Sequence, residues 1–342
     1  MQDLYDRYSK GLRRCVDRVY ADGSDTDLAD RFRANVSRFA AYKADYVKTT
    51  VNNILNDASI PLKQRQEMAD AAVAGFDRYS EAECNTATSR SRTAKQWKEF
   101  NDPQRLRLFP NLRWLPSRSI EKRQSHIQFY DHVWSKGDDF WNHNTPGTEW
   151  NCKCDVEETD DPVTNNGNMD PVQVPAGLEG NPAITREIFT DKASYIKKAR
   201  QDAEKDIIKV VRNYNRKIYN DFNRVFDTEI GKVLVDEITI KETTKGAATT
   251  ESYFLKQEIV QHFDGYVKDL QFATDEDVDL THNNPNNEFH RRKKQFEKMK
   301  VYNLLLKRVD YKGNEITIDY QVKLGLFKKD RTLNLYAITE PK

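Results

Sequence analysis

The chain has 342 residues, which is enough for about two or three domains. Its charged fraction of 32% is high and its hydrophobic fraction of 37% is low for one compact globule, which favours long solvated helices or an elongated assembly subunit. The net charge of +1 excludes a global attraction to nucleic acid, and no apolar run approaches the length of a membrane span.

Residues 1–95 are expected to form amphipathic helices that pack on one another or on a partner. Apolar residues recur at steps of three and four between positions 28 and 51, and Ser59 with Pro61 marks the start of a second helix. The first apolar stripe comprises Leu28, Phe32, Val36, Phe39, Tyr46 or Val47, and Val51, and the second comprises Met68, Ala72 and Phe76.

The four cysteines, at positions 15, 84, 152 and 154, do not have the spacing of a disulfide framework. The charged N-terminus also lacks the apolar core of a secretory signal. We therefore expect a cytosolic origin, with Cys15 and Cys84 as small core residues of the helices.

The segment from Ser89 to Arg118 is locally basic and carries interleaved aromatic residues. Such a segment is able to grip single-stranded nucleic acid through stacking and phosphate contacts. The simpler interpretation, which we favour, is that the arginine stems cover apolar surface while their charged ends stay in water. The basic residues are Arg90, Arg92, Lys95, Lys98, Arg105, Arg107, Arg113 and Arg118.

A tryptophan-rich stretch from Trp97 to Glu158 contains all five tryptophans of the chain among many Pro, Gly, Asn and Asp residues. This composition predicts a loop-rich unit that is held together by aromatic packing. Cys152 and Cys154 form a C-x-C pair, and His126 is a natural third ligand, because Zn²⁺ favours four-coordinate Cys and His sites. If a metal binds, a structural role is expected.

The sequence does not determine which residue would be the fourth ligand of such a site. Asp131, His132 and His143 all have suitable donor atoms, and we take Asp131 as the fourth candidate. Alternatively, the two cysteines are free thiols in a small core or a redox-active pair.

These residues resemble the signature of the Mu F-like head morphogenesis proteins of tailed phages, also called minor head proteins. The matching pieces are Arg123 with His126, Asp138-Asp139-Phe140-Trp141, Pro146-Gly147 and Trp150-Asn151-Cys152-Lys153-Cys154, preceded by FPNLRWLPSRS. The match covers residues 25–160, although many members have a histidine just before Asn-Cys-x-Cys where this chain has Glu149-Trp150. The resemblance implies a virion protein inside the capsid that associates with the portal and other capsid proteins.

After this proposed head-morphogenesis domain (1–158), residues 159–189 are rich in Pro, Gly and Asn and are predicted to be a linker. Residues 190–342 are then expected to form a smaller α+β domain. We predict a helix from Tyr195 to Phe226, a strand at 232–240, a short helix at 251–263 and a second helix at 287–306. Strands at 316–324 and 333–338, joined by a turn at 328–331, would complete an antiparallel sheet.

That order of elements weakly resembles small RNases of the barnase, EndoU, colicin and RelE type. In such an enzyme a base removes the 2′-OH proton and cations hold the phosphate, without a metal. His290 and His282 are the candidates for proton transfer, Arg291, Lys294 and Lys323 for phosphate binding, and Tyr336 or Thr339 for a role on the last strand. A solvated basic helix and histidines without a catalytic role are the simpler interpretation, which we favour.

Three functions therefore remain open. The first, which we favour, is a phage minor head protein that associates with the portal and supports head assembly or genome delivery. The second adds an RNase effector carried in the virion. The third is a metal-stabilised module that binds DNA or RNA.

Overall fold

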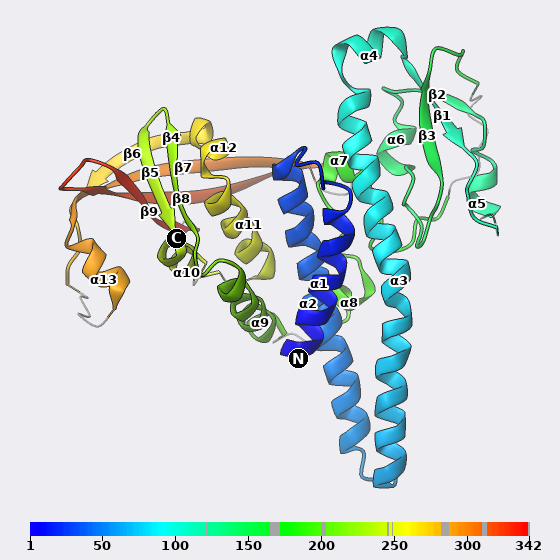
Figure 1. Cartoon of the computed structure of the whole chain (residues 1–342), viewed down its shortest axis with the longest axis horizontal. Coiled ribbons are helices and arrows are strands. Elements are labelled where there is room, and N and C mark those ends of the chain that lie inside the picture. Colours follow the sequence, from blue (N-terminus) through cyan, green and yellow to red (C-terminus); the bar gives the residue numbers. More distant parts are fainter. Residues whose placement is uncertain are drawn as a thin grey trace. The chain divides into compact units, whose positions relative to one another are not determined.

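The computed structural model describes residues 1–120, 122, 124–164, 172–199, 203–244, 246–247, 249–281, 287–309 and 313–340. The chain forms two compact units, one of Met1–Gln201 with Val309–Asn314 and one of Asp202–Arg308 with Glu315–Lys342 (Figure 1). Helices dominate the first unit and the second combines helices with a six-stranded sheet, so the predicted α+β class is confirmed. No described helix is long and apolar enough to cross a bilayer.

The first unit is built on the helices α1 (Gln2–Asp17), α2 (Thr26–Asn56) and α3 (Leu62–Phe100), and α2 and α3 form a long antiparallel hairpin (Figure 1). Asp25 caps α2 by accepting a hydrogen bond from the backbone N–H of Leu28, and Pro61 precedes α3. Both predicted helices are confirmed, and Phe32, Val36 and most of the first predicted stripe are buried. The second stripe is not buried as a whole, because Met68 is exposed and Phe76 is only partly buried.

The prediction for Cys15 and Cys84 was wrong. The packing of α1 on α3 brings their Cα atoms within 5.6 Å, and the two residues form a disulfide. They are 69 residues apart in sequence, so only the tertiary arrangement of the helices pairs them.

The tryptophan-rich stretch folds into a small layer of short elements on the first unit. A three-stranded antiparallel sheet of order β2-β1-β3 forms its centre. Trp114, Trp134 and Trp141 form one buried cluster with Phe129, whereas Trp150 packs elsewhere, against Phe39 and Phe189. The elements are α4 (Pro103–Leu108), β1 (Asn111–Leu115), α5 (Gln124–Ile127), β2 (Val133–Ser135), α6 (Phe140–His143) and β3 (Asp155–Thr159).

The stretch predicted as a linker is, in its described part, folded onto the first unit. Residues 172–199 contain the short helices α7 (Pro182–Thr185) and α8 (Ser194–Lys197), and Leu178, Ile188 and Phe189 are fully buried. The boundary between the units therefore lies at 201/202 rather than within 159–189. The physical reason is that side chains of two helices bond to the backbone of this segment, above all Arg90 on α3 and Asn35 on α2.

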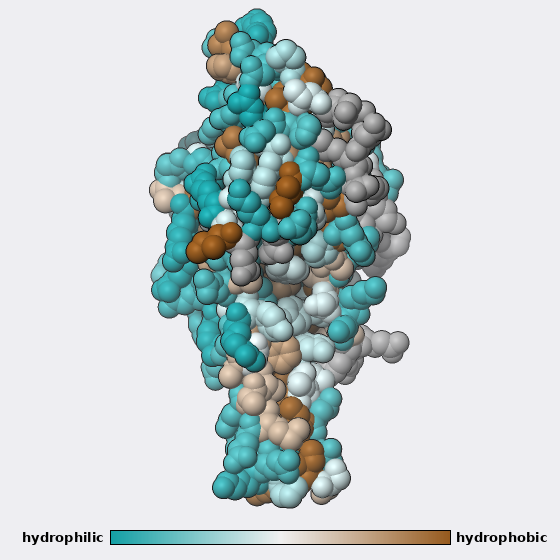
Figure 2. Space-filling view, turned by 90° about the vertical axis from the view of Figure 1, so that its right-hand side faces the viewer, coloured by the Kyte–Doolittle hydropathy of each residue, from teal (hydrophilic) through white to brown (hydrophobic). Residues whose placement is uncertain are grey.

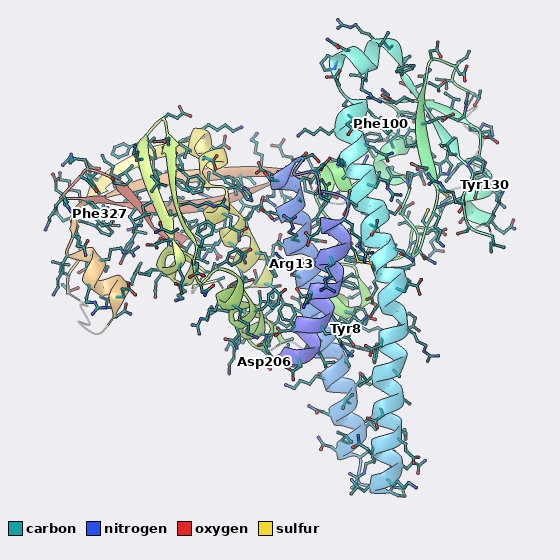
Figure 3. All side chains as sticks on the ribbon, in the orientation of Figure 1. Tyr8, Arg13, Phe100, Tyr130, Asp206 and Phe327 are labelled. Atoms are coloured by element: carbon teal, nitrogen blue, oxygen red, sulfur yellow. A yellow bond between two sulfur atoms is a disulfide. The ribbon has the colours of Figure 1, made fainter. Side chains whose placement is uncertain are left out.

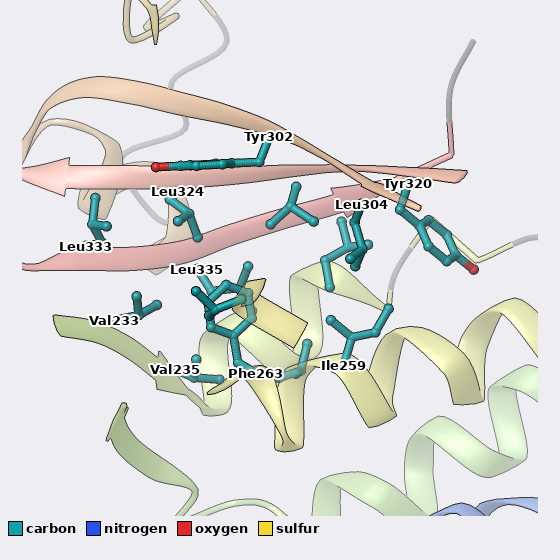
Figure 4. Packing of buried hydrophobic residues seen from close by; sticks show 14 of the residues in the cluster. Val233, Val235, Ile259, Phe263, Tyr302, Leu304, Tyr320, Leu324, Leu333 and Leu335 are labelled. Atoms are coloured by element: carbon teal, nitrogen blue, oxygen red, sulfur yellow. The ribbon is translucent and has the colours of Figure 1, made fainter. Parts of the chain in front are cut away.

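The second unit has a mixed six-stranded sheet of order β4-β5-β9-β8-β7-β6, in which β5 and β9 are parallel. The prediction of a purely antiparallel sheet was therefore wrong. Ile259 and Phe263 pack against the strand residues Leu304, Leu324 and Leu335 in its core (Figure 4). The strands are β4 (Asn223–Thr228), β5 (Gly231–Asp236), β6 (Leu270–Glu276), β7 (Phe296–Val309), β8 (Glu315–Phe327) and β9 (Leu333–Thr339). The helices are α9 (Ala203–Ile218), α10 (Glu237–Thr243), α11 (Thr250–Gln261), α12 (Phe263–Tyr266), the 3₁₀ turn η1 (Val267–Asp269) and α13 (Glu288–Lys293).

Several element predictions for this unit are confirmed and three were wrong. The helix at 251–263 and the hairpin of the last two strands are confirmed. The helix expected to run to Phe226 ends at Ile218, because 223–228 pairs with β5 as a strand. The strand expected at 232–240 ends at Asp236, whose side chain caps α10, and most of the helix expected at 287–306 is strand β7.

Hydrophobic side chains on the surface are dispersed. On the face shown in Figure 2, hydrophobic residues form separate small patches among hydrophilic ones. Isolated exposed apolar residues such as Leu62 and Ile120 are normal for a protein surface and do not by themselves define a binding site.

Candidate metal centre

His126, Cys152 and Cys154 converge in the interior of the first unit. The imidazole Nδ1 of His126 lies 3.7 Å from Sγ of Cys152 and 3.5 Å from Sγ of Cys154. Zn–S bonds of about 2.3 Å and Zn–N bonds of about 2.0 Å at tetrahedral angles would place sulfur and nitrogen about 3.5 Å apart. All three residues are buried and their donor atoms lie within 4.8 Å of one another, so the group is able to hold a metal ion.

The surrounding elements explain why these side chains meet. His126 is in the short helix α5, and the two cysteines are in the turn between α6 and β3. Asn151 adopts a left-handed backbone conformation (φ 60°), which Asn tolerates better than most residues. The Thr86 hydroxyl accepts a hydrogen bond from the Asn151 backbone N–H at 2.8 Å, and the Asn85 amide donates to the Asn151 side chain at 2.9 Å. These two bonds fix the cysteine turn to α3.

The Nε2 atom of His126, on the side of the ring away from the cysteines, lies near a carboxylate. This Nε2 atom is buried without a conventional hydrogen-bond partner among the described residues, and the nearest carboxylate oxygen, of Glu149, lies 3.8 Å away. Glu149 is nearly buried and accepts a hydrogen bond from the Ser125 hydroxyl. A carboxylate behind a metal-bound histidine is a common arrangement that orients the ring and fixes its tautomer.

The two thiols influence each other's pKa. The hydrogen bond from Cys154 lowers the pKa of the Cys152 thiol to about 4 against the effect of burial, with smaller lowering contributions from His126 and then from the Gly147 backbone N–H. The same hydrogen bond, followed by burial, raises the pKa of the Cys154 thiol. The physical reason is that two adjacent buried thiolates repel each other, and a bound cation would remove that repulsion.

Two further polar groups lie beside Cys154. The indole N–H of Trp114 and the hydroxyl of Tyr130 are buried and face its sulfur, and the Tyr130 hydroxyl also interacts with the Ser117 backbone N–H. Both favour the thiolate form of Cys154. Donors that point toward sulfur are what a metal-bound thiolate requires from its surroundings.

The three candidates for a fourth ligand do not join this group, which among the described residues contains His126, Cys152 and Cys154 alone. Asp131 is exposed and turns away in a left-handed conformation (φ 63°), with its N–H bonded to the Trp114 carbonyl. The ring of His132 lies 3.4 Å from the Thr164 hydroxyl, and the ring of His143 is exposed beside Asp139. The prediction of Asp131 as a ligand was therefore wrong, and Glu149, which the sequence analysis did not assign, is the nearby carboxylate.

Most basic residues of the 89–118 segment are engaged within the first unit. Arg90 is fully buried, and five others form ion pairs with acidic side chains. Arg92 and Arg107 are the two without an acidic partner in the part of the chain that the structure describes. The segment is therefore not a free basic surface. The pairs are Lys95 with Asp22, Lys98 with Asp25, Arg105 with Glu158, Arg113 with Glu157 and Asp161, and Arg118 with Asp155.

The candidates for RNA cleavage lie on three elements of the second unit. His290, Arg291 and Lys294 are in or just after α13, Lys323 is on β8, and Tyr336 and Thr339 are on β9. The Tyr336 ring stacks on Phe289 at 4.4 Å and lies under the Lys293 ammonium, and Lys323 pairs with Glu276 at 2.6 Å. These contacts give Tyr336 and Lys323 structural roles. His282 and Arg123 lie outside the described residues.

Comparisons of the chain with protein-family models, with curated proteins and with solved structures found no match. The order of motifs in the sequence and the geometry of the His126–Cys152–Cys154 group, whose residues belong to those motifs, are therefore the grounds on which a function can be proposed.

Proposed function

We propose that the first unit is a metal-braced assembly module of a phage minor head protein, which associates with the portal inside the capsid. The buried convergence of His126, Cys152 and Cys154 is the observation that carries this proposal. It supports the proposal because these residues belong to the motif series that resembles the Mu F-like family. The proposed location is the virion interior, and the host cytoplasm during assembly.

Zinc is the metal that suits this donor set best. Two thiolates and one imidazole are ligands that Zn²⁺ prefers over the oxygen donors that suit Mg²⁺ or Ca²⁺. His126 would bind through Nδ1, which faces both sulfur atoms, and its Nε2–H would point toward Glu149. The bound ion would supply charge compensation and a cross-link between α5 and the cysteine turn.

A structural role follows from the surroundings of the group. All three candidate ligands are buried beneath the tryptophan cluster, so a substrate has no direct route to them in this conformation. Few backbone hydrogen bonds of regular elements hold the segment between β2 and β3. A metal would stabilise such a loop-rich segment directly, because its binding free energy adds to the folding free energy.

Metal analysis of the purified, untagged full-length protein tests the site. We expect about one equivalent of zinc, lost in the Cys152→Ser/Cys154→Ser variant together with a lower melting temperature. The Cys15→Ser/Cys84→Ser variant is the matched control, because it removes two sulfur atoms outside the site and should retain the metal. A wild-type protein without metal, or an unchanged melting temperature in the first variant, would contradict the proposal.

The assembly role needs a separate measurement. The wild-type protein should co-sediment with the portal protein of the same phage, and the Cys152→Ser/Cys154→Ser variant should bind more weakly because its loop segment is loosened. A variant at exposed Arg92, such as Arg92→Met, controls for general surface changes. Retained zinc without any portal binding would separate the metal site from the head-assembly role and refute the latter.

A further inference from the structure

A cleft of about 430 Å³ lies between α1 and α3 in the first unit, away from the candidate metal centre. Both cysteines of the Cys15–Cys84 disulfide line this cleft, and Figure 3 draws a disulfide as a yellow bond between two sulfur atoms. Cys15 is buried and Cys84 is partly exposed, so we expect a reactant in the cleft to attack at Cys84. Three arginines line the same cleft: Arg7 and Arg14 of α1, and Arg18 at its C-terminal cap.

The charges in the cleft do not balance. Its two acidic residues are already paired, Asp77 with Arg7 at 3.0 Å and Glu83 with the buried ammonium of Lys43 at 2.7 Å. Arg14 and Arg18 are exposed and have no acidic partner among the residues that the structure describes. Two guanidinium groups are therefore free to attract an anion, and arginine pairs well with carboxylates and other oxyanions.

These free arginines are adjacent to the disulfide in the sequence and in space. Arg14 precedes Cys15 directly, and Arg18 lies one helical turn beyond Arg14. A disulfide is opened by a thiolate, which is negatively charged, and its rate depends on access and on the stability of the leaving thiolate. Nearby cations raise the local concentration of an anionic reactant and stabilise a leaving thiolate.

We propose that this cleft receives small thiols that carry a second negative charge, such as a carboxylate or a sulfonate, and that the Cys15–Cys84 disulfide exchanges selectively with them. The incoming thiolate attacks Sγ of Cys84, forming a new S–S bond. The Sγ–Sγ bond breaks, and its electron pair leaves on Sγ of Cys15, which takes up a proton from water. A second thiolate then attacks the mixed disulfide, which releases the small-molecule disulfide and the Cys84 thiolate.

The consequence for the protein is a reversible covalent cross-link between α1 and α3. The Cys15–Cys84 disulfide would be reduced in a compartment rich in anionic thiols and would form again in an oxidising medium. This proposal does not depend on the metal centre, because none of the residues lining the cleft belongs to the His126–Cys152–Cys154 group.

The test compares three thiols that differ in charge. The oxidised full-length protein is treated at low ionic strength with 2-mercaptoethanesulfonate, 2-mercaptoethanol or cysteamine. Opening of the Cys15–Cys84 bond is followed by alkylation and peptide mass spectrometry, and each rate is divided by the thiolate concentration. We expect the sulfonate to react about tenfold or more faster than the cationic cysteamine. High salt should remove most of this difference.

Variants assign the selectivity to the cleft. Arg14→Glu/Arg18→Glu should reverse the order of the three thiols, whereas Arg13→Glu, on the same helix but outside the cleft lining, should leave it unchanged. Equal corrected rates for the three thiols in the wild-type protein would overturn the proposal. So would a wild-type protein whose Cys15 and Cys84 stay reduced after air oxidation. The salt series on the wild-type protein gives an answer even if the double variant does not fold.

Discussion

Arg90 offers the sharpest test of how the first unit is held together. Its guanidinium is fully buried and donates hydrogen bonds to backbone carbonyls of the segment after residue 172. The bonds to Leu178 (2.8 Å) and Gly180 (3.1 Å) have good lengths, and those to Glu179 (3.3 Å) and Glu187 (3.4 Å) are longer. Replacing Arg90 by Met keeps an apolar side chain of similar length but removes every donor.

The expected loss of unfolding free energy in the Arg90→Met variant follows from two opposing effects. Burial lowers the pKa of the Arg90 guanidinium to about 10, which means that the charged form is disfavoured inside the protein and its removal recovers some free energy. Against this, each buried carbonyl left without a donor costs about 1–3 kcal/mol. With two short bonds broken, the unpaired carbonyls outweigh the recovered desolvation. We expect Arg90→Met to lower the free energy of unfolding by about 3 kcal/mol.

Urea denaturation followed by tryptophan fluorescence measures this loss in the right unit, because all five tryptophans belong to the first unit. Arg90→Lys should be intermediate, since an ammonium is able to donate to part of the carbonyl set. Arg92→Met is the matched control, because Arg92 is exposed and its replacement should change the free energy of unfolding by less than about 0.5 kcal/mol. A loss below about 1 kcal/mol for Arg90→Met would refute the reasoning.

Three further predictions follow from single residues. Glu149→Gln should weaken zinc binding about 10- to 100-fold in a chelator competition, because the carboxylate behind His126 is lost. Gly147→Ala should destabilise the first unit by about 2 kcal/mol or more in the urea assay, since its φ is +95° and an added Cβ would lie 2.7 Å from Cγ of Arg90. Burial raises the pKa of Asp236 but hydrogen bonds, above all from Arg292, outweigh it, so that the net pKa is lowered. The Asp236 carboxylate therefore stabilises the fold above its unfolded pKa of about 3.9, and this contribution is lost as the pH falls below that value. The melting temperature of the Asp236→Asn variant should therefore depend less on pH in that range than the melting temperature of the wild-type protein.

The parts of the fold that the sequence predicted well depend on local signals. The helices between Leu28 and Phe76 follow from apolar spacing and from their N-terminal residues, but the spacing did not predict the polar residues buried between them, such as the Lys43–Glu83 ion pair. His126, Cys152 and Cys154 were identifiable because few other residue types bind zinc and the C-x-C spacing confines two of them. The weaker ligand prediction, Asp131, failed because residue type alone does not fix where a loop side chain points.

The errors concern features that depend on distant partners. The run after Asn287 contains several good helix formers, yet β7 is a strand because it completes the sheet between β6 and β8. Nothing in the sequence indicates that Cys15 and Cys84, which are 69 residues apart, pair with each other, and the disulfide forms only because α1 packs on α3. The composition of 159–189 did not predict a folded segment, because its backbone is held by residues far away in the sequence, Arg90 on α3 and Asn35 on α2.

The low hydrophobic content of the chain is explained by the hydrogen bonds that attach the loop segments of the first unit to α3. These bonds form at neighbouring points of the helix: Thr86 and Asn85 bond to Asn151, and Arg90 bonds to the segment around Leu178. Trp150 packs against the stacked pair of Phe39 and Phe189, so the cysteine turn and the 172–199 segment also share one aromatic contact. A metal at Cys152 would therefore brace both segments at once. Because polar bonds and a disulfide supplement the apolar core, and a metal held by His126, Cys152 and Cys154 would add to them, the unit needs less hydrophobic surface than a typical globule of its size.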